Sequence, residues 1–251
     1  MTRTRTRQHK QAGAALPRGA RLLLAFVAAG AAASAIPALA GFSPDAQDVV
    51  RFALLGLAAA IAELCVIETG RNHGFPTALV FLVAGALLLP PELVALLALV
   101  QHSPELVRRQ CPWYIQAFNI SNYTINGLAA YAAATLVARV PLGGDDARVA
   151  LGALAACVVF VAVNHLLLAT MLRLARGHSF RGSGLFGAES LSIDIALAAL
   201  GLALAVFAAR TPVLIPVALA PIVLVHRLLL LKAALDSSTP PFALRAQKVV
   251  S

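Results

Sequence analysis

The sequence consists largely of long apolar runs separated by short polar or basic loops, and this pattern restricts the fold more than any other feature. A helix that crosses a bilayer needs about 20 apolar residues, and lipid tolerates only helices or closed barrels as spanning structures. The runs are longer than barrel strands, are rich in Ala and Leu, and do not alternate with polar residues. They cover approximately 21–40, 50–69, 75–89, 92–101, 113–138, 147–174, 185–209 and 212–231. The sequence therefore predicts an all-α, polytopic membrane helix bundle of about eight transmembrane helices.

The composition agrees with a lipid environment. Hydrophobic residues make up 60% of the chain and charged residues only 12%, whereas a soluble domain carries about 25% charged residues. The net charge is +9, but the basic residues lie in short loops and do not interleave with aromatic residues as in single-strand binders. We therefore expect the lipid bilayer as the main partner, and no nucleic acid.

The same pattern gives three regions. Residues 1–19 are predicted to be a basic, disordered cytoplasmic tail, residues 20–232 a transmembrane helical domain, and residues 233–251 a short cytoplasmic tail. The first run resembles a signal peptide, since it follows basic residues and ends in the small-residue stretch at 38–40. It is as long as a full span, however, and further runs follow. A retained first helix is therefore expected.

Lys and Arg counts predict the orientation, because cytoplasmic loops are enriched in these residues. If the N-terminus is inside and the runs 75–89 and 92–101 are separate segments, sixteen basic residues lie inside. The four outside are Arg51, Arg139, Arg148 and Arg210. If the Pro90–Pro91 pair only kinks one helix, the split becomes ten and ten. The first arrangement is favoured, with both termini cytoplasmic at the cell membrane. The two segments are short, so a re-entrant hairpin is an alternative to two crossings.

Several ionisable and amide residues fall within the apolar runs, where each is a functional hypothesis because it is costly in lipid. The spacing of Asn119, Asn122 and Asn126 places them on one face of a helix, which Tyr123 shares. At 1.5 Å per residue, the polar positions lie about 9 to 21 Å from the cytoplasmic helix ends, and His226 is a further one. The predicted ligand-binding or switch residues are Glu63, Asn119, Asn122, Asn126, Asn164, His165 and Asp194.

Two interpretations of these residues remain open. Asn and His often stabilise contacts between membrane helices through hydrogen bonds of at most about 1 to 2 kcal/mol. Alternatively, they bind a ligand or act as a switch. Glu63 and Asp194 need a proton or a partner within the bundle. His165 is a candidate partner, and an imidazole ordinarily changes charge between pH 5 and 8.

No pattern typical of catalysis or metal binding is present. The sequence contains no HExxH, GxSxG or P-loop motif, and no His/Cys set with metal-ligand spacing. Cys65, Cys111 and Cys157 are far apart, and we expect Cys65 and Cys157 to be small core residues. We therefore predict no catalytic residues, no metal and no cofactor.

Several stretches resemble a known family. They are VFLVAGALLLPPELVALLALVQHSPE (80–105), PWYIQAFNISNYTINGLAAY (112–131), NHLLLATMLRLARGHSFRGSGLF (164–186), ESLSIDIALAALG (189–201) and APIVLVHRLLL (220–230). Over roughly residues 50 to 232, the chain resembles the N-terminal membrane region of actinobacterial GGDEF-type diguanylate cyclases and their HD-GYP relatives. In that family the membrane region is an input module, and a cytoplasmic domain after the last helix makes or degrades cyclic di-GMP.

The resemblance implies an input module that is not itself an enzyme. After the eighth run the chain reads KAALDSSTPPFALRAQKVVS, which is too short to fold a cyclase domain. We expect a membrane sensor that signals through a homodimer or a cytoplasmic partner, with residues 226–235 carrying the change outward. The alternative is a small-solute transporter or its substrate-binding subunit, with Pro90–Pro91 as a broken helix, although no inverted repeat is visible. An intramembrane hydrolase using Glu63 and His165 is a third, weaker reading.

Overall fold

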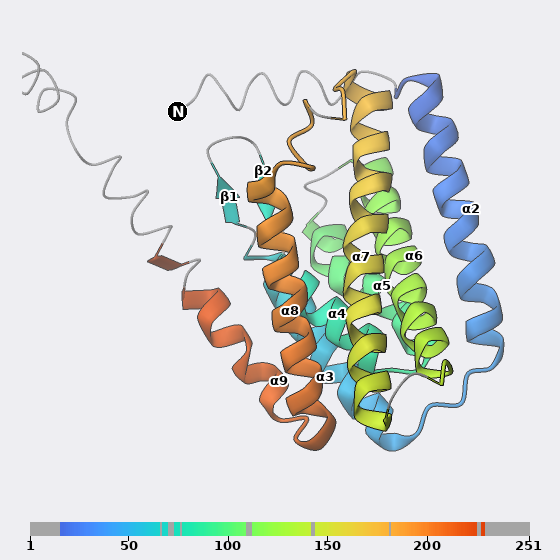
Figure 1. The fold of residues 1–251 in the computed structure, drawn as a ribbon. Coiled ribbons are helices and arrows are strands. Elements are labelled where there is room, and N and C mark those ends of the chain that lie inside the picture. The colour runs from blue at the N-terminus through green and yellow to red at the C-terminus, as the bar shows by residue number, and fades with distance from the viewer. Residues whose placement is uncertain are drawn as a thin grey trace, which may run out of the picture.

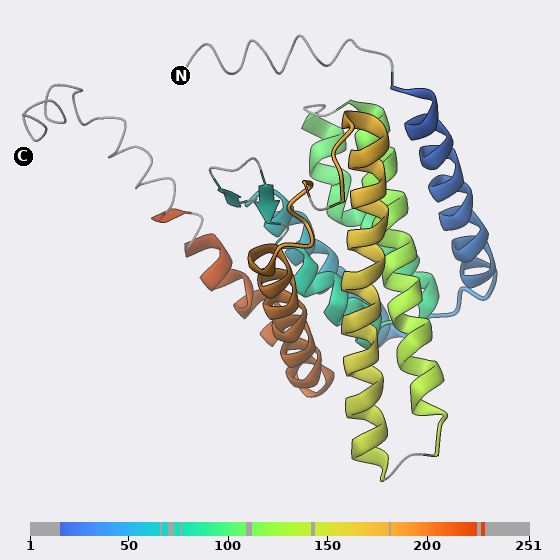
Figure 2. The ribbon, with the colours of Figure 1, turned by 45° about the horizontal axis from the view of Figure 1, so that its top comes forward.

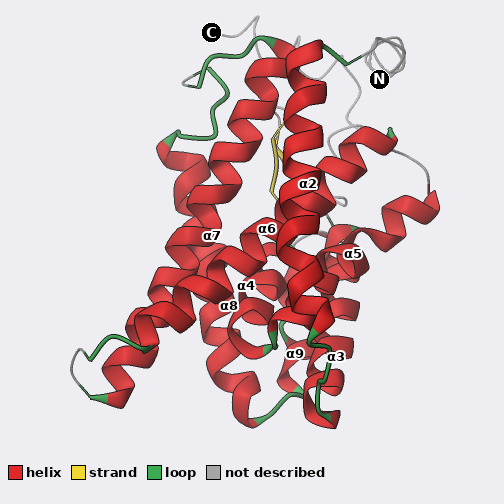
Figure 3. Ribbon diagram, turned by 90° about the vertical axis from the view of Figure 1, so that its right-hand side faces the viewer, coloured by secondary structure: helices red, strands yellow, loops and turns green. Residues whose placement is uncertain are grey.

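The computed structural model describes residues 16–65, 67–69, 73–75, 77–108, 112–141, 144–180, 182–224 and 227–228. These residues form a helical bundle with one small β-hairpin at its edge (Figures 1 and 3). The predicted C-terminal tail, most of the predicted N-terminal tail, Cys111 and His226 lie outside the described residues.

Each of the eight predicted runs corresponds to one helix. In chain order the elements are α2 (Arg18–Ala40), α3 (Ala46–Glu63), β1 (Ile67–Thr69), β2 (His73–Phe75), α4 (Leu79–Leu88), α5 (Pro91–Arg108), α6 (Trp113–Ala138), α7 (Asp145–Arg176), α8 (Ala188–Arg210) and α9 (Leu214–Val217). Residues 219–224 are also helical, so α9 is the first part of an apolar helix that reaches Leu224.

Three of the described helices, α2, α7 and α8, are long and apolar enough to cross a membrane. Leu79–Leu88 and Leu214–Leu224 are apolar but shorter, so the structure does not confirm eight spans. The 26 residues of α6 provide enough length, but its first half carries several amides that lower the mean hydropathy. Helix α3 instead carries three charged residues, Asp48, Arg51 and Glu63, which are costly in the bilayer core.

The predicted helix boundaries at 69 and 75 were wrong. The chain leaves α3 at Glu63 and forms an antiparallel pair in which Ile67 lies opposite Phe75 and Thr69 opposite His73. The β-branched residues in β1 favour a strand, and the glycines at 70 and 74 disfavour a helix.

The Pro90–Pro91 pair reverses the chain. Leu89 is extended, with φ −103° and ψ 150°, as is usual before a proline. A Cβ added to Gly85 would overlap with the side chain of Leu97, whereas a straight helix would hold these positions about 18 Å apart. The segments α4 and α5 therefore form a helical hairpin and not one kinked helix.

Both open ends of this hairpin lie beside the end of α3. Just before α4, Thr77 donates a hydrogen bond from Oγ1 to the carbonyl oxygen of Ala62 at 3.2 Å. Near the end of α5, Gln101 donates from Nε2 to Oε2 of Glu63 at 2.8 Å. The hairpin thus enters and leaves the bundle at the same end.

Helix α4 lies in the centre of the bundle, in contact with α3, α5, α6, α7 and α8. Its residues 79–86 are all buried, which suits a helix that is apolar on every side. On α8, Gly201 packs so closely against α4 that an added Cβ would lie 2.6 Å from the carbonyl oxygen of Val80. The outer helices instead expose large apolar side chains, for example Phe26 at 74% and Val149 at 68%, a surface suited to lipid.

The helices define two ends of the bundle. We call the end at which α2 begins the amino end; it also holds the end of α3, the start of α6, the end of α7 and the start of α8 (Figure 1). There, Gly19 packs against Leu174. At the opposite end, Arg51 donates a hydrogen bond to the carbonyl oxygen of Ala209 at 3.1 Å. Figure 2 shows α2 on one side of the α6–α7 pair and α8 with α9 on the other.

Candidate functional site

A buried imidazole–carboxylate pair joins α7 to α8. Nε2 of His165 lies 2.6 Å from Oδ2 of Asp194, and the two residues are only 2% and 6% exposed. The edge of the His165 ring faces Phe186, with the centroids 5.8 Å apart. After Asp194, α8 is apolar as far as residue 209, so this pair lies where the apolar part of α8 begins.

Three asparagines form a hydrogen-bonded cluster next to this pair. Nδ2 of Asn122 donates to Oδ1 of Asn164 at 2.7 Å, and Nδ2 of Asn126 donates to the same oxygen at 3.3 Å. All three side chains are buried. Because Asn164 precedes His165 on α7, the cluster and the imidazole–carboxylate pair form one group, which we call the asparagine–histidine group.

Asn119 is the exception among the predicted asparagines. It lies one turn nearer the amino end of the bundle and is half-buried. Within the described part of the chain its side chain makes no hydrogen bond. It shares the helix face but not the cluster.

Glu63 belongs to a second group, with two residues of α5. Gln101 donates to its Oε2 at 2.8 Å, and Nδ1 of His102 lies 3.4 Å from its Oε1. We call Glu63, Gln101 and His102 the glutamate group. The sequence suggested His165 as a partner for either carboxylate, and the structure places it against Asp194 instead of Glu63.

Tyr123 connects the two groups. Its ring stacks on His102 with the centroids 5.5 Å apart, and on its other side lies Phe160 at 6.4 Å. Tyr123 also follows Asn122 directly on α6, so it adjoins the asparagine–histidine group as well. The predicted residues therefore occupy two neighbouring groups, with Tyr123 of α6 between them.

Sequence reasoning missed the contribution of α5 because it ended this helix at Gln101. The structure continues it through Pro104 to Arg108. A proline has no N–H for the carbonyl four residues earlier, here that of Val100. The Ser103 hydroxyl donates to this carbonyl oxygen at 2.7 Å, which compensates for the missing bond. The buried Gln101 and His102 therefore lie within a helix, and the adjacent amide and imidazole in an apolar run were the signal.

Among the other buried polar residues that were missed, two have long side chains that can carry or bind charge. Gln116, in the first turn of α6, donates to Glu105 at 2.5 Å and is 3% exposed. Glu92 is 6% exposed and lies in the first turn of α5, where the helix dipole favours a carboxylate. No cluster of three or more His, Cys, Asp or Glu suited to a metal is present in the described residues.

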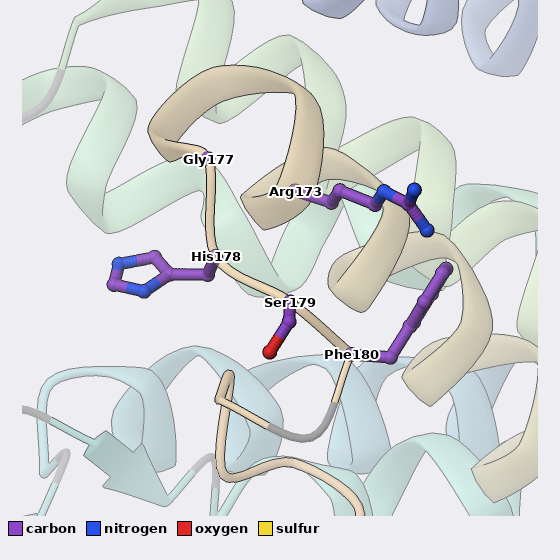
Figure 4. Close-up of a pocket in the computed structure, with 5 residues that line it drawn as sticks. All are labelled: Arg173, Gly177, His178, Ser179 and Phe180. Carbon is purple, nitrogen blue, oxygen red and sulfur yellow. The ribbon is translucent and has the colours of Figure 1, made fainter.

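A surface pocket lies at the end of α7 and in the loop that follows it. It is lined by Arg173, Gly177, His178, Ser179 and Phe180 (Figure 4). Gly177 has φ 72° and ends α7 in the left-handed conformation. The guanidinium of Arg173 lies over the Phe180 ring at 5.2 Å, while His178 points away from both (Figure 4).

Comparisons with known proteins do not extend this picture: no family model, no curated protein and no solved structure matches the chain.

Proposed function

We propose that this chain is an integral membrane sensory module that signals through a second protein or a second copy of itself. The observation that carries this proposal is the buried His165–Asp194 pair between α7 and α8. The resemblance of residues 50 to 232 to family input modules supports the same conclusion.

The physical argument starts from the cost of burying charge. Breaking a buried ion pair by neutralising one partner is strongly destabilising, because the other charge is left uncompensated. Any stimulus that changes the charge or the hydrogen bonding of His165 or Asp194 therefore changes how α7 and α8 pack. A switch of this kind needs two packings that differ in their interaction with the stimulus.

The route from the pair to a partner runs along α8. This helix contacts α9, and α9 also contacts α3, the helix that carries Glu63. Both predicted groups of site residues are thus one helix away from α9. We propose that residues 226–235, of which the structure describes only 227 and 228, carry the change to the cytoplasmic partner.

We further propose that the chain crosses the cell membrane several times, with the α4–α5 hairpin re-entrant and both termini cytoplasmic. The distribution of charge supports this orientation. Arg18, Arg21, Arg108, Arg173 and Arg176 lie at the amino end of the bundle; Arg51, Arg139, Arg148 and Arg210 lie at the opposite end. The amino end, together with the remaining Lys and Arg residues of the N-terminal tail, would face the cytoplasm.

Co-purification from native membranes, with a tag on the C-terminus, tests the proposal. We expect a signalling protein, or a second copy of the chain, to co-purify and to be lost when the residues after Leu231 are deleted. Asp194→Asn should change the recovery of the partner, whereas Ile195→Ala on the exposed face of α8 should not. Recovery of the chain alone, or with an ATPase pair, contradicts the proposal.

One observation favours a different function, a small-solute transporter. The α4–α5 hairpin is a discontinuous element in the centre of the bundle, with the buried Glu92 at its tip, and transporters often bind substrates at such interruptions. Uptake of a labelled solute into proteoliposomes, abolished by Glu63→Gln, would establish this alternative.

A further inference from the structure

Unsatisfied polar atoms concentrate in one part of the bundle. Nine buried side-chain nitrogen or oxygen atoms of the described residues have no hydrogen-bond partner, and eight of them belong to residues of the two groups or to Gln116. These residues are Gln101, His102, Gln116, Asn122, Asn126, His165 and Asp194. We call them, with Glu63, Glu105 and Asn119, the polar seam. The ninth atom, Nε of Arg51, lies at the opposite end.

Such a concentration is unusual for a protein interior. More than nine in ten buried polar groups in proteins are hydrogen-bonded, either to protein or to ordered water. A buried water typically joins about three otherwise unsatisfied polar groups. Eight unpartnered polar atoms on four neighbouring helices therefore favour hydration of this part of the bundle by a few water molecules over a dry interior.

The less buried residues of the polar seam lie at the amino end of the bundle. Glu105 and Gln116 pair at the start of α6, and Glu105 is only partly buried. Glu63, at the end of α3, retains 10% of its side-chain exposure. Asn119 is half-buried one turn further in. Burial then becomes almost complete at Asn122 and Asn126.

The polar seam stops in the middle of the bundle. Directly after Asn126, Gly127 packs closely against Val94 of α5. A Cβ added to Gly127 would lie only 3.0 Å from Cγ1 of Val94. One turn further, Ala130 is 1% exposed and lies in the same apolar core as Phe160. The residues of α7 before Asn164 and of α8 after Asp194 are apolar as far as 151 and 209.

We infer that the polar seam is a one-sided hydrated path that admits water and small hydrophilic solutes from the amino end to the His165–Asp194 pair and ends at Asn126. The path deepens the proposed function, because it determines the side from which a hydrophilic stimulus reaches the pair. Only the biological meaning of the path rests on that proposed function. The path is itself a property of the bundle and can be measured without a partner.

Cysteine accessibility tests the path. Single cysteines replace Asn119 or Asn126 in a background of Cys65→Ala, Cys111→Ser and Cys157→Ala. Ala130→Cys is the matched control, since it lies one turn past Asn126 on the same face of α6. Leu166→Cys is the lipid-side control, because it follows His165 and is 55% exposed.

The probe is the silver ion, in chloride-free buffer, applied to vesicles of either orientation. A cysteine added at the N-terminus marks which side is the amino end. Protection from later fluorescent maleimide, measured after denaturation, reports the reaction of each cysteine with silver. Gel filtration of each variant in detergent verifies that it is folded, and Asn119→Cys removes no described hydrogen bond.

From the amino end, Asn119→Cys and Asn126→Cys should react at least about tenfold faster than Ala130→Cys and Leu166→Cys, because only a hydrated thiol supplies the reactive thiolate. From the opposite side all four should react slowly. Equal rates at positions 126 and 130, or faster reaction from the opposite side, would overturn the inference. Loss of the partner in co-purification is a separate result, so failure of the path and failure of the signalling proposal can be told apart.

Discussion

Nε2 of His165 on α7 lies 2.6 Å from Oδ2 of Asp194 on α8. Beyond this pair and the adjoining Asn164, towards the opposite end of the bundle, both helices are apolar as far as residues 151 and 209. The pair fixes how α7 and α8 face each other over the half of their length near the amino end. Towards the opposite end, only a contact of 3.6 Å from Sγ of Cys157 to the carbonyl oxygen of Ala198 is polar between them among the described residues. His165–Asp194 is therefore an ionisable contact between two otherwise largely apolar helices.

The first prediction concerns the energetics of this pair. His165→Leu leaves the Asp194 carboxylate buried without its partner, which typically costs about 3 to 5 kcal/mol. The double variant His165→Leu/Asp194→Leu removes the carboxyl group as well as the imidazole. We expect it to be more stable than His165→Leu alone. Reversible unfolding in mixed detergent micelles measures the cycle. Losses that simply add, with the double variant the least stable, would contradict the role of the pair.

The second prediction compares two asparagines on neighbouring helices. Asn164→Leu removes the oxygen that accepts from both Asn122 and Asn126, so we expect a loss of about 1 to 2 kcal/mol. Asn119→Leu removes no described hydrogen bond and is the matched control, with an expected change within about 0.5 kcal/mol. Detergent unfolding of both variants is the measurement. A larger effect at Asn119 would show that the cluster is assigned to the wrong residues.

The sequence predicted the helices better than their contacts. The eight apolar runs each became a helix, and the spacing of Asn122 and Asn126 placed both on the face that meets Asn164. These are local properties, because a run length and a helical period are determined by the nearby chain. The resemblance and the function it implies remain predictions.

What the sequence could not provide depends on register between distant segments. Whether His165 faces Glu63 or Asp194 is determined by the axial position of α7 relative to α3 and α8. Nothing in the apolar pattern of the sequence specifies that position. The extension of α5 was missed because Ser103–Pro104 reads as a helix stop, whereas the Ser103 hydroxyl repairs the break. The β-hairpin was missed because Ile67 and Phe75 are as apolar as the helices on either side.

The third prediction tests the close packing of α4 against α8. A side chain at position 201 would meet the Val80 carbonyl oxygen at 2.6 Å and the Val83 side chain at 2.9 Å, and the backbone cannot move aside as a flexible side chain would. Gly201→Ala should therefore cost about 1 to 3 kcal/mol, despite the better helix propensity of alanine.

For a chain of this size, each kcal/mol corresponds to a fall in Tm of about 2 to 4 °C. Ala199→Val, at an exposed position two residues away on α8, is the control and should leave the Tm nearly unchanged. An unchanged or raised Tm for Gly201→Ala would mean that α4 and α8 are further apart than described.

The last prediction concerns the segment of α5 that brings His102 into the bundle. Ser103→Ala removes the hydrogen bond to the Val100 carbonyl oxygen, leaving that oxygen without a donor because residue 104 is a proline. We expect a loss of about 0.5 to 1.5 kcal/mol. Pro104→Ala restores the backbone N–H, so in that background Ser103→Ala should cost almost nothing. Unfolding of the four members of this cycle measures the coupling. Equal costs in both backgrounds would show that the hydroxyl does not substitute for the missing N–H, and that other contacts hold α5 helical through Pro104.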